Sequence, residues 1–385
     1  MTTKHRKIMV VAGEASGDAH AAKLVNALRA AEPSIAFEFF GSAGPKMREA
    51  GVDPVIQSDD MSVVGIAEIA RVLPMFLQAL KKLKAAALER KPEVVVLVDF
   101  PDFNLKLAKW LKKNGFTVVY YISPQLWAWR KYRVAAIRKY VDLLLTILPF
   151  EKDWYASHGV YNVEYVGNPL ANEVSSSVSR DEFCKQNQLD PTKPMVALLP
   201  GSRHKEIVRI LPVMLASAAE MSKSQPEMQF VIAVASGRNC VDVKNAIEAA
   251  SEMPASLSII ENDTYSVLAH SKAAAVTSGT ATLETGILGT PMVIVYATSD
   301  LNYALLKPLI SVEHYGLINL IAGKKVAKEL IQQDFTPAVV AEELFRLLDP
   351  EVNATVRSDL RQAREKLGSG GASKRAAEAI LRLIG

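Results

Sequence analysis

Residues 195–207 read MVALLPGSRHKEI, and this stretch contains the three parts that decide the fold: a buried strand, a sharp turn and the start of a helix. The turn alone would require Gly201 and Ser202, but not Arg203. A helix that follows a strand in this way begins with free N–H groups and a partial positive charge, which together bind anions. We therefore expect Gly201 to let a phosphate approach the backbone, Ser202 to cap the helix or bond the phosphate, and Arg203 to donate to it. The alternative is a capped helix with an incidental surface arginine.

The same rhythm of strand and helix runs through the whole chain. Short runs rich in Val, Ile and Leu alternate with helical patterns, which is typical of a parallel sheet covered on both faces. The predicted strands begin at Lys7, Phe37, Glu93, Phe116, Val141 and Val163 in the first half, and at Met195, Met228, Leu257, Ala273 and Pro291 in the second. The fold class is therefore α/β, with two doubly wound domains that bind ligands beyond the carboxyl ends of their strands.

The length of 385 residues favours two domains over a single core. The polar, serine-rich and proline-punctuated segment 172–194 is the best linker candidate. We place the first domain at 1–170 and the second at 171–367. A Gly/Ser patch at 367–373 leads into a last helical segment, within 368–385, whose pattern assigns it to neither domain.

Composition excludes several classes of protein. Hydrophobic residues make up 49% and charged residues 22%, which is typical of a globular chain. The net charge of +4, without blocks of like charge, argues against a nucleic-acid partner. Cys184 and Cys240 show neither metal-ligand spacing nor a disulfide framework, so we expect a cytoplasmic protein. The apolar run after MTTKHRK is too short for a signal peptide, and no run approaches the length of a transmembrane span.

A second loop in the second half resembles the first in its chemistry. TSGTATLETG, from Thr277, again follows an apolar strand and opens a helix, so Ser278, Gly279 and Thr280 form another anion cradle. Glu284 lies one turn further and can accept from both ribose hydroxyls, or it is a glutamate favoured by the helix dipole. Neither loop is a Walker or dinucleotide motif. Together the two loops predict a site for a diphosphate with a nucleoside attached.

The first half carries a comparable loop, AGEASGD, from Ala12. We expect Ser16 and Asp18 to cap the helix that runs through Ala19 to Ala31. Glu14 has no capping duty, which makes it a candidate for sugar hydroxyls; the alternative is an ordinary polar turn residue.

The strongest catalytic candidate lies in VDFPDFN, from Val98. Asp99 ends a fully apolar strand. A carboxylate there loses its solvation, which is unfavourable unless the group is paired or has a catalytic role. Such a carboxylate suits a general base. Pro101 stops the strand, and Asp102 or Asn104 can start the next helix. Asp102 is also a candidate for binding the substrate. The spacing is not the Asp-x-Asp of metal-dependent glycosyl transfer and no histidine cluster is present, so we expect no metal and no cofactor.

These loops, with GIAEI, YISPQLWAWR and ILPFEKDWY, together resemble the lipid-A-disaccharide synthase family over nearly the whole chain. The resemblance implies a GT-B fold, with two Rossmann-like domains facing each other across a cleft. It also implies an inverting transfer of 2,3-diacylglucosamine from UDP-2,3-diacylglucosamine to 2,3-diacylglucosamine 1-phosphate (lipid X). The products would be the β(1→6)-linked disaccharide 1-phosphate and UDP, made at the cytoplasmic face of the inner membrane.

The resemblance also implies roles for matching residues. Asp99 would be the base that deprotonates the acceptor 6-hydroxyl, and Glu14 and Ser16 would be required polar residues. Arg203 would bind either the diphosphate or the acceptor phosphate. Asn319, in LINLIAG, matches a family asparagine, although Ile318 replaces the proline that usually precedes it.

In this scheme the second domain holds UDP, and the first holds the acceptor and is completed by the helix within 368–385. The sequence specifies neither acyl-chain length nor oligomeric state, and it is compatible with a homo-oligomer. A UDP-GlcNAc 2-epimerase-type isomerase, with the same fold and UDP site, is the main alternative. A solute-binding protein and a dinucleotide-dependent oxidoreductase fit less well, because a signal peptide and the glycine fingerprint are missing.

One further segment, Met61 to Lys84, is apolar on more than one face. We expect Pro74 to divide it into two helices. Lys81, Lys82 and Lys84 follow as anchors for anionic headgroups, which favours contact with the membrane surface over the alternative, a buried helical hairpin. LWAWRKYR, from Leu126, adds interfacial Trp and Arg, or lines the acceptor site.

Overall fold

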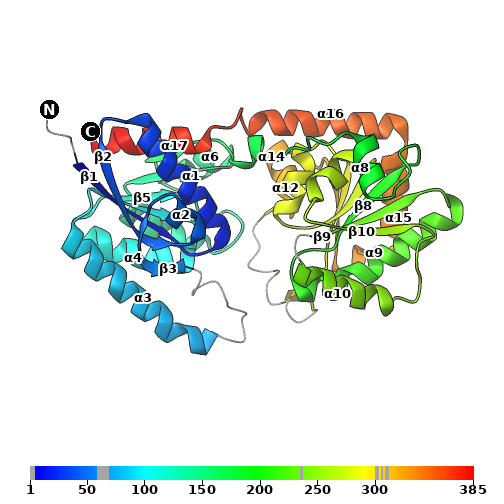
Figure 1. Ribbon diagram of the computed structural model, residues 1–385, viewed down its shortest axis with the longest axis horizontal. Helices are drawn as coiled ribbons and strands as arrows, with labels where there is room; N and C mark the ends of the chain where they lie inside the picture. Colours follow the sequence, from blue (N-terminus) through cyan, green and yellow to red (C-terminus); the bar gives the residue numbers. More distant parts are fainter. Residues whose placement is uncertain (1–4, 59–68, 235–236, 300–302, 305–306, 308–311) are drawn as a thin grey trace. The chain divides into compact units, whose positions relative to one another are not determined.

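The computed structural model describes residues 5–58, 69–234, 237–299, 303–304, 307 and 312–385. The chain divides into two compact units (Figure 1). Unit 1 comprises Met1–Pro169 and Ser369–Gly385, and unit 2 comprises Leu170–Gly368. Each unit contains one sheet with helices on both of its faces, so the predicted α/β class is confirmed.

The sheet of unit 1 has seven strands in the order β3-β2-β1-β4-β5-β6-β7, and every pairing is parallel. Its strands are β1 (His5–Ala12), β2 (Ala36–Ala43), β3 (Asp53–Gln57), β4 (Val94–Val98), β5 (Val118–Tyr121), β6 (Leu143–Thr146) and β7 (Val163–Tyr165). Its helices are α1 (Ala15–Ala31), α2 (Pro45–Glu49), α3 (Ile69–Arg90), α4 (Pro101–Lys113), the short 3₁₀ helix η3 (Lys131–Arg133), α5 (Val134–Tyr140), α6 (Glu151–Ser157) and α17 (Ala372–Ile384).

The core of unit 1 lies on both faces of this sheet. Val10 and Ile380 belong to the layer under α1 and α17, while Met9 and Leu107 belong to the layer under α3 and α4. Because both faces are buried, the strands are apolar at nearly every position rather than at alternate ones. The last helix of the chain, α17, packs beside the first, α1, and Arg375 in α17 donates to the carbonyl of Val166 at 2.7 Å (Figure 1).

The sheet of unit 2 has six parallel strands in the order β10-β9-β8-β11-β12-β13. Its strands are β8 (Met195–Leu199), β9 (Gln229–Val234), β10 (Leu257–Glu261), β11 (Ala273–Thr277), β12 (Met292–Tyr296) and β13 (Lys328–Ile331). Its helices are α7 (Leu170–Glu173), α8 (Arg180–Gln186), α9 (His204–Ser224), α10 (Gly237–Glu248), α11 (Thr264–His270), α12 (Thr280–Ile287), α14 (Leu317–Ala322), α15 (Pro337–Leu348) and α16 (Pro350–Lys366).

Both sheets have the same topology in their first six strands. The chain builds one half of the sheet outward from a central strand, β1 or β8, and then crosses to the other side of that strand to form β4 or β11. The order of strands therefore reverses between β1 and β4 in unit 1 and between β8 and β11 in unit 2. In open α/β sheets, ligands bind outside the carboxyl ends of the strands at such a switch point. This fixes where each unit can place a site.

The predicted linker at 172–194 is wrong, because this segment is a packed part of unit 2. It contains α8, whose Phe183 and Cys184 are fully buried. The guanidinium of Arg180 donates to the carbonyls of Pro191, Lys193 and His270, which ties the segment to its neighbours. The composition of this segment is polar, and that suggested a linker. Two buried apolar side chains are nevertheless enough to anchor a helix as short as α8.

The prediction that Pro74 divides the segment Met61 to Lys84 into two helices is also wrong. Helix α3 continues from Ile69 through Pro74 to Arg90. A proline removes one backbone donor, and so close to the start of a long helix the remaining turns still hold it together. The first part of this segment, Met61 to Glu68, lies outside the described residues.

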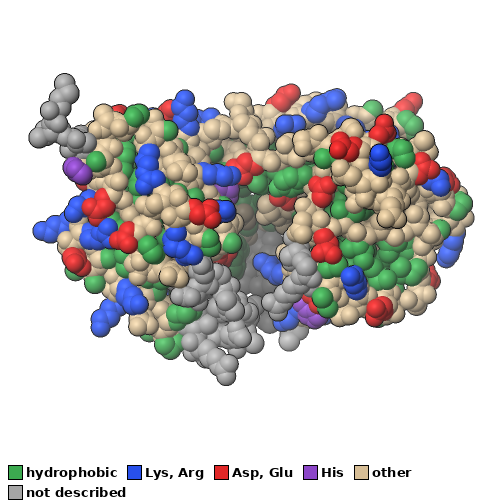
Figure 2. Space-filling model, viewed as in Figure 1, with side chains coloured by type: hydrophobic (Ala, Val, Ile, Leu, Met, Phe, Trp, Pro, Cys, Tyr) green, Lys and Arg blue, Asp and Glu red, His purple; other side chains and the backbone are tan. Residues whose placement is uncertain are grey.

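On the side shown in Figure 2, the basic and acidic side chains of the described residues are interspersed over each unit. Among the helices that the structure describes, none is both long and apolar enough to cross a bilayer.

Candidate functional site

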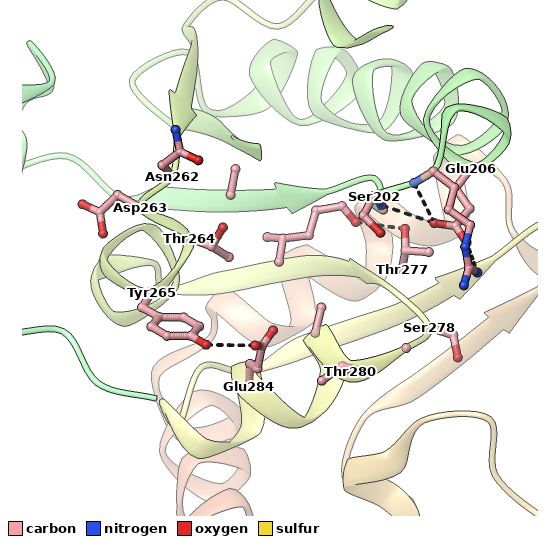
Figure 3. Close-up of a pocket in the computed structure, with 16 residues that line it drawn as sticks. Ser202, Glu206, Asn262, Asp263, Thr264, Tyr265, Thr277, Ser278, Thr280 and Glu284 are labelled. Carbon is pink, nitrogen blue, oxygen red and sulfur yellow. Dashed lines mark hydrogen bonds and ion pairs between the residues drawn. The ribbon is translucent and has the colours of Figure 1, made fainter. Parts of the chain in front are cut away.

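A cavity of about 590 Å³ lies at the switch point of unit 2. Its walls come from the loops that follow β8, β10 and β11 (Figure 3). The residues predicted from the two polar loops all line it: Gly201, Ser202, Arg203, Ser278, Gly279, Thr280 and Glu284. Figure 3 shows Tyr265 and Glu284 at one end of the cavity and Ser202 and Glu206 at the other. The structure therefore brings these residues together in one site.

The loop after β8 is a tight turn that only glycine fits. Gly201 has φ +105°, and a Cβ atom there would lie 2.6 Å from Oε2 of Glu206. The N–H groups of Ser202 and Arg203 both donate to this Oε2, at 3.3 Å, and Nη1 of Arg203 lies 3.1 Å from Oε1. The expectation that Ser202 caps the helix is therefore wrong, since the carboxylate of Glu206 accepts from the N–H groups at the start of α9. The alternative, a bond from Ser202 to a phosphate, stays a prediction.

The loop after β11 holds the other side of the cavity. Gly279 is the N-cap of α12, so the N–H groups of Thr280 and Ala281 in its first turn have no partner within the helix, while the N–H of Thr282 donates to the carbonyl of Gly279 at 3.1 Å. Glu284 lies one turn further along α12, and its Oε1 accepts from the hydroxyl of Tyr265 at 2.9 Å. Burial raises the pKa of Glu284, while the hydrogen bond from Tyr265 opposes that rise. Glu284 is thus a half-buried, oriented acceptor beside a helix start.

Asn319 lies outside the cavity lining and is completely buried. Its Nδ2 donates to the carbonyl of Ala327 at 2.8 Å and to Oε1 of Glu329 at 2.9 Å. Its Oδ1 accepts from the N–H groups of Val326 and Ala327, both at 2.9 Å. All of its hydrogen-bonding groups are therefore used inside unit 2.

The contacts of Asn319 nevertheless reach the cavity through two further residues. The carboxylate of Glu329 accepts from the N–H groups of Tyr315 and Gly316, at 3.0 and 2.9 Å. The carbonyl of Tyr315 in turn accepts from Oγ of Ser278 at 3.0 Å. Asn319 thus supports the loop that orients Ser278, without lining the cavity itself.

The switch point of unit 1 is closed by an aromatic ring. Gly13, which follows β1, lies so close to Phe100, which follows β4, that a Cβ atom on it would be 2.3 Å from the ring. Asp99 and Phe100 have φ values of +48° and +52°, a left-handed conformation that is rare for two successive residues with side chains. Strained backbone of this kind clusters at functional sites. The strain therefore marks the turn at Asp99 as a candidate functional position.

Two hydrogen bonds to the carbonyl of Asp99 hold this turn. The carbonyl of Asp99 accepts from the hydroxyl of Tyr120 at 2.6 Å and from Nδ2 of Asn104 at 2.7 Å. Burial and, to a smaller extent, the negative charge of Glu14 raise the pKa of the Asp99 carboxyl to about 6, against a hydrogen bond from the N–H of Phe100 that lowers it. A carboxylate with this pKa is ionised at neutral pH yet basic enough to take a proton.

Glu14 and Ser16 lie at the same switch point, and both are exposed. β1 and β4 are paired in register up to Ala12 and Val98, so the residues that follow these two strands are neighbours. The prediction that Ser16 and Asp18 cap a helix beginning near Ala19 is wrong, because α1 begins at Ala15 with Glu14 as its N-cap. Asp18 is buried and instead caps α2, accepting from the N–H groups of Gly44, Lys46 and Met47.

Asp102 is exposed in the first turn of α4, which begins at Pro101 rather than at Asp102 or Asn104. Its carboxylate forms ion pairs with Arg130 and Arg133. Both arginines belong to the segment LWAWRKYR, which follows β5.

The motifs YISPQLWAWR and ILPFEKDWY of unit 1 meet at a buried glutamate, Glu151. The backbone N–H groups of Ile147 and Leu148 donate to its Oε2, and Nε1 of Trp127 donates to its Oε1 at 3.0 Å. Burial raises the pKa of Glu151 to about 7, against these hydrogen bonds. Glu151 thereby joins the loops that follow β5 and β6, and it fixes the base of the segment that carries the arginines.

Sequence reasoning missed several of these residues. Asn262, Asp263, Thr264 and Tyr265 line the cavity and follow β10, so their position after a predicted strand was the signal that could have revealed them. Tyr120, by contrast, lies within an apolar strand, and only the fold shows that its hydroxyl reaches the carbonyl of Asp99. Within the described part of the chain, no three His, Cys, Asp or Glu side chains are grouped so as to hold a metal ion.

Comparisons with known proteins agree over nearly the full length of the chain. The model of the family described as lipid-A-disaccharide synthetase matches residues 8–383. A curated lipid-A-disaccharide synthase from Trichlorobacter lovleyi is 43% identical over 380 residues, which cover 98% of this chain and 98% of that protein.

Solved structures resemble the fold. The glycosyltransferase of kitacinnamycin has a TM-score of 0.63 at 15% identity and covers 99% of both chains. UDP-GlcNAc 2-epimerase from Neisseria meningitidis, bound to UDP-GlcNAc, has a TM-score of 0.62 at 13% identity and covers 98% of this chain and 100% of its own. At these identities the likeness concerns the fold alone, and it confirms the predicted GT-B class.

Proposed function

Because the chain belongs to the lipid-A-disaccharide synthase family, it is a glycosyltransferase of lipid A biosynthesis, and we propose that it joins UDP-2,3-diacylglucosamine to lipid X. The observation that carries this proposal is the cavity of unit 2, which has two anion-binding loops and an oriented carboxylate at a switch point. The main alternative, a UDP-GlcNAc 2-epimerase-type isomerase, is supported only by likeness of fold.

In this proposal a nucleoside diphosphate lies in the cavity with its ribose at the end that holds Glu284 and its diphosphate at the end that holds Ser202. Glu284, oriented by Tyr265, would accept from the two ribose hydroxyls. The diphosphate would lie at the starts of α9 and α12, where Gly201 and Gly279 leave the backbone open and Ser202, Ser278 and Thr280 supply hydroxyls. Arg203 would donate to the diphosphate once that group replaces Glu206. Asn319 would act indirectly, by holding the loop that orients Ser278.

Unit 1 would supply the base. Asp99 would accept the proton of the acceptor 6-hydroxyl as its oxygen attacks the anomeric carbon of the donor sugar. The bond from that carbon to the diphosphate oxygen breaks, and UDP leaves with the electron pair. A single displacement of this kind inverts the anomeric centre and gives the β(1→6) linkage. Glu14 and Ser16, beside Asp99, would bind sugar hydroxyls.

We also propose that the protein works at the cytoplasmic face of the inner membrane. The supporting feature is the exposed side of α3, on which Leu77 is 58% exposed and Leu88 51% exposed. Lys81 is exposed on the same side, four residues after Leu77. Exposed leucines beside lysines are typical of a helix that lies in the interface of an anionic bilayer.

The membrane contact is tested by replacing both leucines with serine. The variant should leave the membrane fraction and keep its activity in detergent, while the same change at buried Leu83 should unfold the protein. A Leu77→Ser/Leu88→Ser variant that sediments with membranes as the wild type does would contradict the proposed contact.

The function itself is tested with the two substrates. Purified protein is incubated with UDP-2,3-diacylglucosamine and lipid X, and the products are identified by mass spectrometry. A disaccharide 1-phosphate and an equal amount of UDP are expected. An interconverted UDP-sugar without net release of UDP would identify the isomerase instead.

A further inference from the structure

Two arginines lie at the carboxyl edge of the unit 1 sheet and share a single carboxylate. Nη1 of Arg130 lies 3.1 Å from Oδ1 and 3.3 Å from Oδ2 of Asp102, and Arg133 pairs with the same Oδ1. One negative charge thus faces two positive charges, which leaves a net charge of +1 in the cluster. Each guanidinium has five N–H donors, so both keep donors for a further oxygen ligand.

The arginines are held in fixed positions rather than extended into solvent. Arg130 has φ +57°, a left-handed conformation, and its guanidinium stacks 4.1 Å from the ring centroid of Trp129. Arg133 ends η3 directly before α5 and is only 17% exposed. A side chain that is already ordered loses little entropy when it binds a ligand, so this pair is suited to recognition.

The pair lies beside the proposed base. Asp102 follows Asp99 by three residues, and the arginines belong to the segment after β5, the strand that pairs with β4. Tyr120, at the end of β5, donates to the carbonyl of Asp99, and the charge of Arg133 acts on the hydroxyl of Tyr120. The same edge of the sheet therefore carries a carboxylate that can take a proton and a paired cation that can take an anion.

We propose that Arg130 and Arg133 bind the phosphate monoester of the acceptor, and that Asp102 holds the two guanidinium groups in place. The proposal rests on the function proposed above, in which lipid X is the acceptor. A phosphate monoester presents three oxygens and up to two negative charges, which matches two guanidinium forks better than a single carboxylate does. Arg203, which is 83% exposed and lies in the other unit, is then left for the diphosphate of UDP.

The test is a cycle that removes the arginines and the phosphate separately and together. Wild type and the Arg130→Gln/Arg133→Gln variant are each assayed with lipid X and with 2,3-diacylglucosamine, which lacks the phosphate. The assay uses nonionic detergent micelles, so no phospholipid is present. Wild type should lose roughly 10- to 100-fold in kcat/KM when the phosphate is removed, as expected for charge-assisted hydrogen bonds. The variant should show a similar loss with lipid X and less than about a threefold further loss without the phosphate.

Two control variants separate this result from general effects of charge. Arg138→Gln removes an exposed arginine from α5, the helix that directly follows Arg133, and should leave the KM for lipid X unchanged. Arg203→Gln should weaken the binding of the donor, UDP-2,3-diacylglucosamine. Its loss of activity should be the same with and without the acceptor phosphate. A thermal melt of each variant checks the fold, and Arg130→Lys/Arg133→Lys, which keeps both charges, should recover part of the activity.

The outcomes are distinct. If the losses from the two changes simply multiply, the arginines do not bind the acceptor phosphate, although the transferase assignment stands. If the variant is fully active in detergent but loses binding to phosphatidylglycerol vesicles, the arginines bind a membrane headgroup and the proposal is overturned. If wild type forms no disaccharide with either acceptor, both the proposal and the function on which it rests fail.

Discussion

The two units share one topology and use its switch point in opposite ways. In unit 2 the loops after β8 and β11 separate around a cavity of about 590 Å³. In unit 1 the corresponding place, after β1 and β4, is filled by Phe100, which packs against Gly13. One switch point holds glycine, serine and threonine at helix starts, and the other holds a half-buried carboxylate on a strained turn.

This difference separates what a topology decides from what its residues decide. The reversal of strand order fixes where loops can meet, and it does so equally in both units. The chemistry depends on the few residues that follow each strand, because these decide whether the space opens or closes. Small residues leave a cavity open in unit 2, whereas in unit 1 the ring of Phe100 fills the corresponding place beside Asp99. Burial of the Asp99 carboxyl raises its pKa.

The largest effect is expected at the closed switch point. Replacing Asp99 by Asn keeps the size of the side chain but removes the base, so kcat should fall by roughly two to four orders of magnitude. UDP binding should change little, because the cavity belongs to unit 2. Kinetics with both substrates, together with calorimetry of UDP, check this. Near-normal turnover would move the base to another residue, with Glu14 as the first candidate.

The pH dependence of turnover tests the same residue without mutation. Asp99 must be ionised to accept a proton, and its pKa is raised to about 6. Activity in wild type should therefore fall about tenfold per pH unit below pH 6 and level off above it. A pH–rate profile from pH 4.5 to 8.5 measures the inflection, and an inflection near pH 4 would mean that the base is a solvated carboxyl.

A smaller effect is expected at the open switch point. Glu284→Ala should weaken the binding of both UDP and uridine by about 1.5–3 kcal/mol, because it removes a charge-assisted acceptor of the ribose. Arg203→Ala should weaken UDP by a similar amount and leave uridine unaffected. Calorimetry of both ligands separates the two residues. Unchanged UDP affinity in Arg203→Ala would detach this arginine from the diphosphate.

The contrast also explains what the sequence could predict. The buried strands were recognised because both faces of each sheet are covered, which makes the strands continuously apolar. The two strands that were missed, β3 and β13, are edge strands with mixed sequences, DPVIQ and KELI, and β3 is mostly exposed. Periodicity carries little information for strands of this kind.

The site residues divide in a similar way. Residues that follow a strand directly, such as Asp99 and Gly201, were identified because topology alone brings them to the edge of the sheet. Tyr265 was missed because its importance comes from a single contact with Glu284, which is 19 residues further along the chain. The function of Glu206 as a cap was hidden because the helix start was expected to be empty.

The turn at Asp99 provides a prediction of intermediate size. Tyr120→Phe removes one hydrogen bond to the carbonyl of Asp99 and leaves the ring in place, so the carboxylate should lose orientation rather than charge. We expect kcat to fall roughly five- to tenfold, in line with about 1 kcal/mol for a neutral hydrogen bond, with the KM of both substrates unchanged. Tyr265→Phe, which removes a hydroxyl from the other switch point, is the matched control and should change UDP binding instead.

The smallest effect concerns stability. Ionisation of the half-buried Asp99 carboxyl lowers the stability of the folded protein. The pKa of Asp99 is raised in the folded protein, so its carboxyl favours folding in the protonated form, and that contribution is lost as pH rises from about 4 through about 6. Asp99→Asn cannot ionise and escapes this loss. Its melting temperature should therefore rise relative to that of wild type between pH 4.5 and pH 8. Scanning calorimetry at both values measures the change. A difference that does not depend on pH would mean that the Asp99 carboxyl is solvated in the folded state and that burial does not raise its pKa.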